Sequence, residues 1–435
     1  MSTEAVKENI IKIADNCKEN IITHGREILH NPEAGYKEEK TSAYIRKCFE
    51  ELGIEYTYPL GLTGVKGTIK GKTEGPNVCI IGEMDAVVCK DHPCADSNGY
   101  AHACGHNAQI AAMLGAAEAI VKSGLTEKIC GSISFFAVPA EEFIEIEHRK
   151  KLKKEGKINF FGGKQQLIAD GAFDDVDIAM MIHAQPNEKE PLMYVRGYNL
   201  GFVAKTITLL GKATHGSTPQ YGTNALNAAA LAIIGIHSNR DTFTEKDRIR
   251  IHPIITKGGD IVNTVPDEVC IETYVRGATP EAIKKGCDAV DRSVDGAATI
   301  IGARAQTETI PGYLPIDECI ELSEIFEKNT EHILGKNTLV YGKEITGSTD
   351  MGDLSMIMPA IQPSIGGFGG SLHSGEFEVY NEETAYISSA KILALTAADL
   401  LCENAEKAKK IISGFKPKMT KEEYLNYVGG KENVE

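Results

Sequence analysis

The sequence predicts an α/β protein, in which a smaller α+β domain interrupts a helix-covered, mostly parallel sheet. The chain has 435 residues, more than one hydrophobic core usually accommodates, so we expect two domains. Strand and helix patterns alternate up to about Gly201, which indicates a mostly parallel sheet, and the pattern changes there. We therefore expect one domain of residues 1–200 and 313–435, with a second domain of residues 201–312 inserted into it.

The elements of the first domain follow from hydrophobic periodicity. Apolar residues recur at helical spacing from Lys7 to Leu29, and Pro32 ends this helix because proline disfavours helix just before it. The polar tail after Lys416 is expected to be loosely held. Buried strands are expected at residues 78–82, 129–138 and 176–182, and helices at residues 108–121, 164–169 and, with an amphipathic face that closes the domain, 383–413.

The inserted segment has the pattern of two strand-helix-strand units, which is typical of a small α+β domain. The expected strands are residues 202–210, 248–256, 268–274 and 303–309, and the expected helices are residues 224–236 and 280–297.

Composition narrows the class of function. A formal net charge of -15 argues against a nucleic-acid binder, because phosphate contacts need clustered Lys and Arg, and it favours small molecules or proteins as partners. The six Lys and Arg of residues 148–157 are interpreted as a solvated surface. No segment has the length and apolarity of a membrane span, and the N-terminus lacks the apolar core of a secretion signal. Because eleven thinly spread cysteines resemble reduced thiols, we expect a cytoplasmic protein.

Polar residues follow each predicted strand of the first domain. Glu83-Met84-Asp85 ends the first strand, Glu141 and Glu142 follow the second, and His183 follows the third. In open α/β sheets ligands bind at the carboxyl ends of the strands, so these side chains are expected to converge.

Cys104 and His106 join this group just before a predicted helix. A turn at Gly105 would let both face one ion, and thiolate, imidazole and carboxylate together suit Zn, or Mn and related ions such as Co and Ni, but not Ca. Singly, each residue has an ordinary explanation: a chance spacing, a surface glutamate pair, a core histidine at His183 and a loop histidine at His373. Together they favour a metal site over four coincidences.

At this point the chain resembles the metallopeptidase family of aminoacylases, hippurate hydrolase, auxin-conjugate hydrolases and p-aminobenzoyl-glutamate hydrolase. The resemblance covers nearly the whole chain, and its specificity lies in the order of its motifs. These are His30-Asn31-Pro32-Glu33-Ala34-Gly35-Tyr36, Gly82-Glu83-Met84-Asp85-Ala86, His102-Ala103-Cys104-Gly105-His106, Pro139-Ala140-Glu141-Glu142, Gly211-Lys212-Ala213-Thr214-His215, Asn263-Thr264-Val265-Pro266-Asp267, Gly347-Ser348-Thr349-Asp350-Met351-Gly352-Asp353 and His373-Ser374.

The resemblance implies a set of roles for the site residues. It implies Glu141 as general base, Asp85 as the residue that orients a ligand, and His215 as the group that meets the oxyanion, within a lid domain that mediates dimerisation or higher homo-oligomers. Asn263 and Arg276 would hold the substrate carboxylate. The two divalent ions would be held by Cys104, His106, Glu142, His183 and His373.

Two positions depart from many relatives of this family. Asn107 stands where an Asp is common and Gln109 where a second His is common. Asn107, together with Gly162-Gly163-Lys164 and Ser348-Thr349-Asp350, is closer to the p-aminobenzoyl-glutamate hydrolase and dipeptidase-like branch.

The expected activity is metal-dependent hydrolysis of an amide bond in an acyl-amino acid, an aminobenzoyl-glutamate-like conjugate or a dipeptide. Two alternatives stay open from the residues alone. Cys104 would be the nucleophile of a cysteine hydrolase, which alkylation inhibits and chelators do not. Otherwise the chain would be a non-catalytic protein with a structural metal, which a closed four-ligand site would favour.

Overall fold

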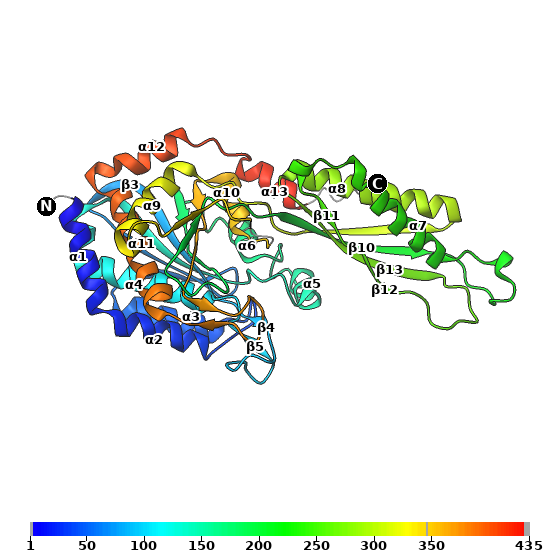
Figure 1. Cartoon of the computed structure of the whole chain (residues 1–435), viewed down its shortest axis with the longest axis horizontal. Coiled ribbons are helices and arrows are strands. Elements are labelled where there is room, and N and C mark those ends of the chain that lie inside the picture. Colours follow the sequence, from blue (N-terminus) through cyan, green and yellow to red (C-terminus); the bar gives the residue numbers. More distant parts are fainter. Residues whose placement is uncertain (1–2, 345–346, 430–435) are drawn as a thin grey trace. The chain divides into compact units, whose positions relative to one another are not determined.

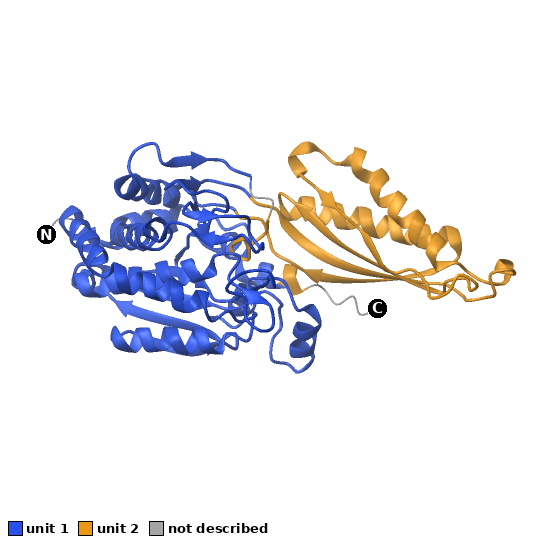
Figure 2. Ribbon diagram, turned by 60° about the horizontal axis from the view of Figure 1, so that its bottom comes forward, with its two compact units in different colours: residues 1–198, 317–344, 353–425 blue, residues 199–316, 345–352, 426–435 orange. Residues whose placement is uncertain are grey.

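A computed structural model describes residues 3–344 and 347–429, and the chain divides into two compact units (Figure 2). Unit 1 comprises Met1–Tyr198, Asp317–Glu344 and Asp353–Leu425. Unit 2 comprises Asn199–Ile316, Ile345–Gly352 and Asn426–Glu435. Both units combine helices with sheets, so the predicted α/β class is confirmed.

The main sheet of unit 1 has six strands in the order β1-β2-β6-β3-β7-β16. β6, β3, β7 and β16 run parallel to one another, whereas β2 pairs antiparallel with β6 and β1 pairs antiparallel with β2 at the edge. Residues Val78–Ile81 of the central strand are buried, because both faces of this sheet are covered. The strands are β1 (Glu55–Leu60), β2 (Gly64–Lys70), β3 (Thr73–Glu83), β6 (Cys130–Val138), β7 (Ile178–Met180) and β16 (Ala360–Ile361).

Two buried helices pack on the central strands. α4 (His106–Ser123) and α11 (Ser389–Leu401) contact β3 and β6, and α1 (Thr3–Asn16) and α2 (Lys18–Leu29) contact α4 (Figure 1). The Ala-rich sequence of α4 allows this close approach. The other helices outside residues 199–316 are α3 (Glu39–Glu51), α5 (Ile146–Lys154), α6 (Gly163–Ala169), α9 (Ile320–Leu334), α10 (Met351–Ile357), α12 (Glu406–Gly414) and α13 (Lys421–Gly429).

Short strands at the carboxyl side of the main sheet carry the loops of the candidate site. A four-stranded sheet has the order β15-β9-β17-β8, and two ribbons pair β4 with β5 and β18 with β19. Their bounds are β4 (Val87–Val88), β5 (Tyr100–Ala101), β8 (His183–Ala184), β9 (Met193–Val195), β15 (Leu339–Tyr341), β17 (Ser364–Ile365), β18 (Phe368–Gly369) and β19 (Glu378–Val379).

Unit 2 is an antiparallel sheet with two helices along one face, as Figure 1 shows. The strand order is β11-β13-β10-β14, and β12 also pairs with β13. Apolar side chains of α7 and α8 pack on those of β10 and β13 in a core of its own. The bounds are β10 (Gly201–Leu210), α7 (Ala225–Ser238), β11 (Arg250–Ile251), β12 (Ile254–Lys257), β13 (Glu268–Gly277), α8 (Pro280–Ile301) and β14 (Arg304–Pro311).

Two elements that the sequence predicts as continuous are broken. The helix expected from Lys7 to Leu29 is two helices, α1 and α2, which meet at Cys17 with φ -98° and ψ 5°. The strand expected over residues 248–256 divides into β11 and β12 around Pro253, which has no amide hydrogen to donate to the neighbouring strand.

The C-terminal segment also differs from the prediction. The single helix expected over residues 383–413 is a π-helical turn (Glu383–Ser388), then α11 and then α12, with a break where Asn404 has φ 59°. Every residue of α11 is buried, so it has no solvated face. The described part of the tail after Lys416, up to residue 429, is held rather than loose, because Tyr424 of α13 is buried and its hydroxyl donates to Asp353 Oδ1 at 2.9 Å. Residues 430–435 lie outside the described residues.

In the described part of the chain, no single helix has the length and apolarity needed to cross a membrane. One pair, Glu383–Leu401 and Glu403–Gly414, passes such a test only jointly and is bent by 68°.

Candidate metal centre

Cys104 and His106 flank a tight turn between β5 and α4. Gly105 has φ 86°, and a side chain there would come within 2.6 Å of Ala184 Cβ, so both the conformation and the space require glycine. His106 is the first residue of α4 and is fully buried. This turn directs the thiol and the imidazole into the same interior.

Two histidines have their rings oriented by backbone carbonyls. His106 Nδ1 donates to the carbonyl oxygen of Asp85 at 2.8 Å, and His183 Nδ1 donates to the carbonyl oxygen of Ala184 at 2.9 Å. When these rings are neutral, Nε2 therefore carries the lone pair, which is the form in which imidazole binds metals. Cys104 Sγ lies 3.6 Å from His183 Nε2.

Glu142 and His373 form the other side of the same cluster. Glu142 Oε1 lies 3.1 Å from His373 Nε2, and the Glu142 amide donates to Asp85 Oδ2 at 2.9 Å. The His373 amide donates to the carbonyl oxygen of Ala103 at 2.8 Å, which ties its loop to the Cys104 turn. Asp85 thus contacts both His106 and Glu142, which is consistent with a role in orienting these residues.

The donor atoms fall into groups that suit metal ions. Within each group the atoms lie within 4.8 Å of one another, and one thiol, Cys104, belongs to two groups. The structure therefore brings all five predicted ligands together, with Cys104 between the two halves. The groups are Cys104, His106 and His183; Cys104, Glu142 and His373; and Glu83, His106 and Glu141.

The buried carboxylates of the cluster favour a positive charge beside them. Burial, reinforced by Glu142 and Glu141, raises the pKa of the Cys104 thiol well above its ordinary value. Burial opposes protonation of His106, but Glu83 and Asp85 outweigh it and raise the His106 pKa to about 9. The buried atoms His106 Nε2, Asp85 Oδ1 and Glu142 Oε1 have no hydrogen-bond partner among the described residues. Divalent ions fit this donor set and would satisfy these atoms.

Three residues of this region were not assigned to the site from the sequence. Glu83 is fully buried beside His106, and its carboxylate is paired with the fully buried Lys164. The sequence did contain a signal for Glu83: it lies two positions before Asp85 at the end of a strand, where side chains two positions apart point to the same side. Arg149 corrects the interpretation of residues 148–157 as solvated, since it is buried and donates to the carbonyl oxygens of Glu142 and Phe161.

The two departures from the family pattern have distinct contacts. Asn107 Nδ2 donates to the carbonyl oxygen of Gly25 at 3.3 Å and to the Tyr386 hydroxyl at 3.1 Å. Gln109 Nε2 donates to Glu83 Oε2 at 2.8 Å, and its Oε1 accepts from the Glu83 amide at 3.0 Å. Asn107 therefore supports α4 against α2, whereas Gln109 fixes Glu83.

Three of the predicted site residues belong to unit 2. His215 Nε2 lies 3.0 Å from Asn263 Nδ2, and His215 Nδ1 lies 2.6 Å from Ser217 Oγ. Arg276 has other neighbours: it donates to Ser348 Oγ at 2.9 Å and lies over the rings of aromatic residues of β10 and β13. In unit 2, His215 therefore contacts Asn263, and Arg276 contacts Ser348 and two aromatic rings.

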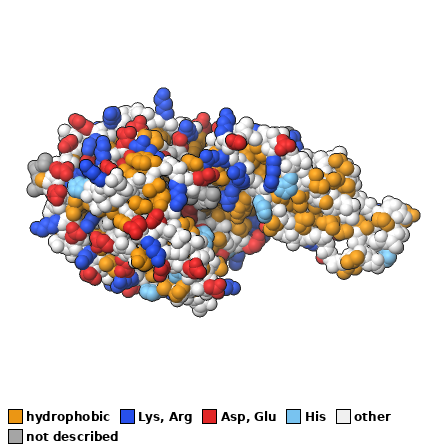
Figure 3. All heavy atoms as spheres, viewed as in Figure 1, with side chains coloured by type: hydrophobic (Ala, Val, Ile, Leu, Met, Phe, Trp, Pro, Cys, Tyr) orange, Lys and Arg blue, Asp and Glu red, His pale blue; other side chains and the backbone are white. Residues whose placement is uncertain are grey.

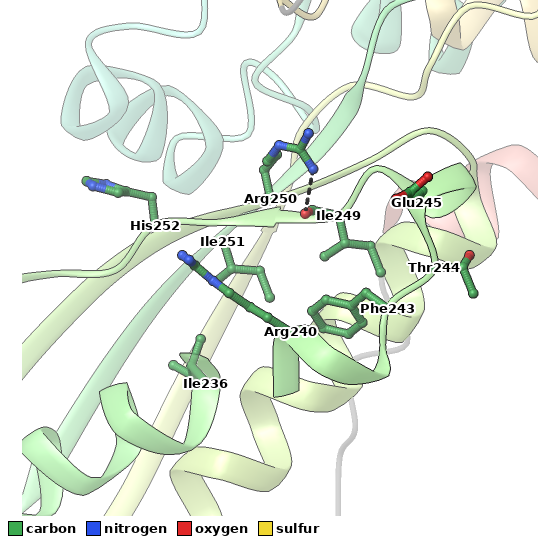
Figure 4. A pocket seen from close by; sticks show the side chains of 9 residues that line it. All are labelled: Ile236, Arg240, Phe243, Thr244, Glu245, Ile249, Arg250, Ile251 and His252. Carbon is green, nitrogen blue, oxygen red and sulfur yellow. Dashed lines mark hydrogen bonds between the residues drawn. The ribbon is translucent and has the colours of Figure 1, made fainter. Parts of the chain in front are cut away.

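A separate cavity of about 540 Å³ lies within unit 2, between α7 and β11. Arg240 and Phe243 border it, and Arg250 donates to the carbonyl oxygen of Ile249 at 3.2 Å (Figure 4). It includes none of the ten predicted site residues.

Comparison with known families identifies the chain. Residues 79–399 match the model of the peptidase family M20/M25/M40. The chain belongs to this family. The predicted resemblance is thereby confirmed, and the protein is an enzyme of a peptidase and amidohydrolase family.

Individual relatives span almost the whole chain. An IAA-amino acid hydrolase ILR1-like 2 of Arabidopsis thaliana is 26% identical over 411 residues, which cover 90% of this chain and 87% of the relative. The Bacillus subtilis YXEP protein, a dinuclear metal-binding peptidase, has a TM-score of 0.71 at 22% identity, covering 89% of this chain and 99% of that one. An aminobenzoyl-glutamate utilization protein of Klebsiella pneumoniae has a TM-score of 0.64 at 17% identity, covering 89% and 97%. These structures share the fold of this chain.

Proposed function

We propose that this protein hydrolyses an amide bond in an N-acyl amino acid, an aminobenzoyl-glutamate-like conjugate or a dipeptide, releasing a free amino acid, with two divalent ions. The observation that carries the proposal is the pair of ligand groups that share Cys104, with the carboxylate of Glu141 beside them. When bound, the ions would lower the pKa of water and polarise the scissile carbonyl. Zinc or manganese suits these ligands, and cobalt and nickel have related preferences.

Glu141 serves as the general base. Its Oε2 lies 3.9 Å from His106 Nε2, and the side chain is buried next to the ligand Glu142 without belonging to either Cys104 group. It takes the proton from the attacking water and returns it to the leaving amine nitrogen. Asp85 holds His106 and the backbone of Glu142 in place during both transfers.

The inserted domain of residues 201–312 supplies the lid in this proposal. His215, supported by Asn263, donates to the oxyanion, and Asn263 and Arg276 hold the substrate carboxylate. A preorganised donor of this kind lowers the barrier by about 3 kcal/mol. Bidentate geometry makes Arg276 suited to a carboxylate, and its contact with Ser348 orients it.

We also propose that the inserted domain mediates homodimers or higher homo-oligomers. Unit 2 exposes apolar side chains, among them Ile254 and Ile255 of β12 and Ile261 and Val262 of the segment between β12 and β13. Figure 3 shows hydrophobic side chains gathered over this unit. Sedimentation of the purified chain tests this assembly.

We propose the cytoplasm as the compartment of this protein. Among the described residues no cysteine forms a disulfide, which supports a reducing compartment.

A substrate panel with metal depletion tests the proposed reaction. Acyl-amino acids, dipeptides and aminobenzoyl-glutamate are assayed with the metal-loaded protein, the chelator-treated protein and the treated protein after Zn²⁺ or Mn²⁺ is restored. We expect turnover of at least one class, loss of that turnover on depletion and recovery on restoration. Turnover that survives complete metal removal contradicts the proposal.

The cysteine-nucleophile alternative is disfavoured by the surroundings of Cys104. A reactive cysteine needs a lowered pKa, whereas burial and the carboxylates of Glu142 and Glu141 raise the pKa of this thiol. The non-catalytic alternative is disfavoured by Glu141, because a buried carboxylate that adjoins ligands without joining a Cys104 group suits turnover better than folding.

A further inference from the structure

Glu141, the proposed general base, follows a strained turn. Ala140, the residue directly before it, has φ 54°, in the left-handed region that residues with a side chain rarely adopt. For a residue other than glycine this conformation is disfavoured about 5- to 30-fold relative to the right-handed one. The turn therefore keeps its shape only because contacts around it hold it, and these contacts decide where Glu141 lies.

The buried carboxyl group of Glu38 binds the amide side of this turn. The Ala140 amide donates to Glu38 Oε1 at 2.8 Å, and Glu38 Oε2 lies 2.6 Å from the Thr63 hydroxyl. Glu38 is 0% exposed and lies 102 positions from Ala140 in the chain. On the other side of Ala140, its carbonyl oxygen accepts from the Gly163 amide at 3.0 Å. Both peptide groups of Ala140 are therefore hydrogen-bonded.

Close packing against two glycines also confines the turn. A side chain at Gly35 would come within 2.8 Å of Ala140 Cα, and a side chain at Gly163 would come within 1.6 Å of the Pro139 carbonyl oxygen. Both of these contacts, and the bond from the Gly163 amide, are made by backbone atoms. The bond between Glu38 and the Ala140 amide is the one that depends on a side chain, so it is the one that a substitution can remove.

The Glu38 side chain does not cap the helix that follows it. α3 begins at Glu39, and the Glu38 side chain makes no capping hydrogen bond to its first turn. The Glu33 carboxylate fills that place, because it accepts from the amides of Lys40 and Thr41 at 3.1 and 3.0 Å. A role in starting α3 therefore does not account for the buried carboxyl group of Glu38, whereas its bond to the turn does.

We propose that Glu38 is a positioning residue for the general base: its carboxyl group holds the Ala140 amide and so keeps the turn that places Glu141. This inference rests on the proposed metal-dependent function. Burial and the nearby Asp85 raise the pKa of Glu38 to about 8. The neutral carboxyl group still has an oxygen that accepts from the Ala140 amide, and a glutamine side chain offers the same acceptor in the same shape.

Kinetics of three variants test this role on the best substrate of the panel, with kcat, KM and the bound ions measured. Glu38→Met removes the acceptor at similar size. It is expected to retain two ions and to lower kcat about 5- to 30-fold with little change in KM, because Ala140 then leaves the left-handed region. Glu38→Gln keeps the acceptor and is expected to stay within about threefold of wild type. The double variant Glu38→Met with Ala140→Gly is expected to regain most of the lost kcat, since glycine adopts positive φ without a side-chain penalty.

Glu39→Met is the matched control, because Glu39 is the next residue in the chain and its side chain is exposed. It is expected to behave as wild type. The positioning role is overturned if a folded Glu38→Met loses an ion or keeps kcat within about threefold of wild type. It is also overturned if Glu38→Gln loses as much kcat as Glu38→Met, or if adding Ala140→Gly restores none of the loss.

Two further measurements cover the remaining outcomes. If Glu38→Met does not fold, Glu38→Asp replaces it under the same criteria, because its shorter side chain withdraws the acceptor from the Ala140 amide. Wild type without metal-dependent turnover refutes the proposed function instead. The positioning role is then decided by the φ of Ala140 in crystal structures of wild type and Glu38→Met: a change to negative φ supports it, and an unchanged φ overturns it.

Discussion

Replacing Glu141 with Gln isolates the proton-transfer role of this side chain. The amide keeps the size of the carboxylate but does not accept a proton at neutral pH. Because Glu141 lies outside both Cys104 groups, Glu141→Gln is expected to retain two ions. Loss of a general base slows turnover by about 10²- to 10⁴-fold, which corresponds to about 3 to 5 kcal/mol in the barrier. KM is expected to change little, because the base acts on water rather than on the bound substrate.

The assay measures kcat, KM and metal content on the best substrate of the panel. Glu147→Gln is the matched control, because the Glu147 side chain lies in the same part of the chain and is 90% exposed. It is expected to behave as wild type. If Glu141→Gln keeps its two ions and its kcat stays within about threefold of wild type, Glu141 is not the general base. If its ions are lost, Glu141 is a ligand and its catalytic assignment is wrong.

Three further predictions follow from the charges of the structure. Affinity for the metal should rise about 100-fold per pH unit between about pH 6 and 8, because binding displaces one proton from Cys104 and one from His106, whose pKa is about 9. Calorimetry in two buffers measures the protons released. A pH-independent affinity contradicts this prediction. Lys164→Met should lower the free energy of unfolding of the metal-free protein, measured in urea, by about 3–5 kcal/mol, because it leaves the Glu83 carboxylate buried without its counter-charge. The double variant Lys164→Met with Glu83→Gln should recover most of this stability. If the double variant loses as much stability as Lys164→Met alone, the pairing is contradicted. Arg276→Met should raise KM at least about tenfold with little change in kcat if it binds the substrate carboxylate; an unchanged KM removes it from the substrate site.

Local pattern predicted the elements that carry the site. The apolar run at Val78–Gly82 forms the centre of β3, and the Ala-rich segment after His106 forms α4. These elements were predictable because burial of a strand and of a helix leaves a periodic mark in the chain. The breaks at Cys17 and in the C-terminal helix were not predictable, since apolar periodicity continues across both.

The sequence by itself determined the family and the chemical identity of the donor atoms. Cys104, His106, Glu142, His183 and His373 were named as ligands from motif order, because a thiolate, imidazoles and a carboxylate have fixed metal preferences wherever they lie. The structure brings these side chains into groups that share Cys104.

Only the tertiary structure decided how these atoms are oriented and which charges balance them. The carbonyl of Asp85 sets which nitrogen of His106 is free, and Lys164 lies 81 positions from Glu83 in the chain yet neutralises it in the interior. Pattern along the chain records burial and local conformation, but a pairing between two buried charges depends on how separate elements pack. For this reason the place of Glu83 between Lys164 and His106 was known only from the distances in the structure.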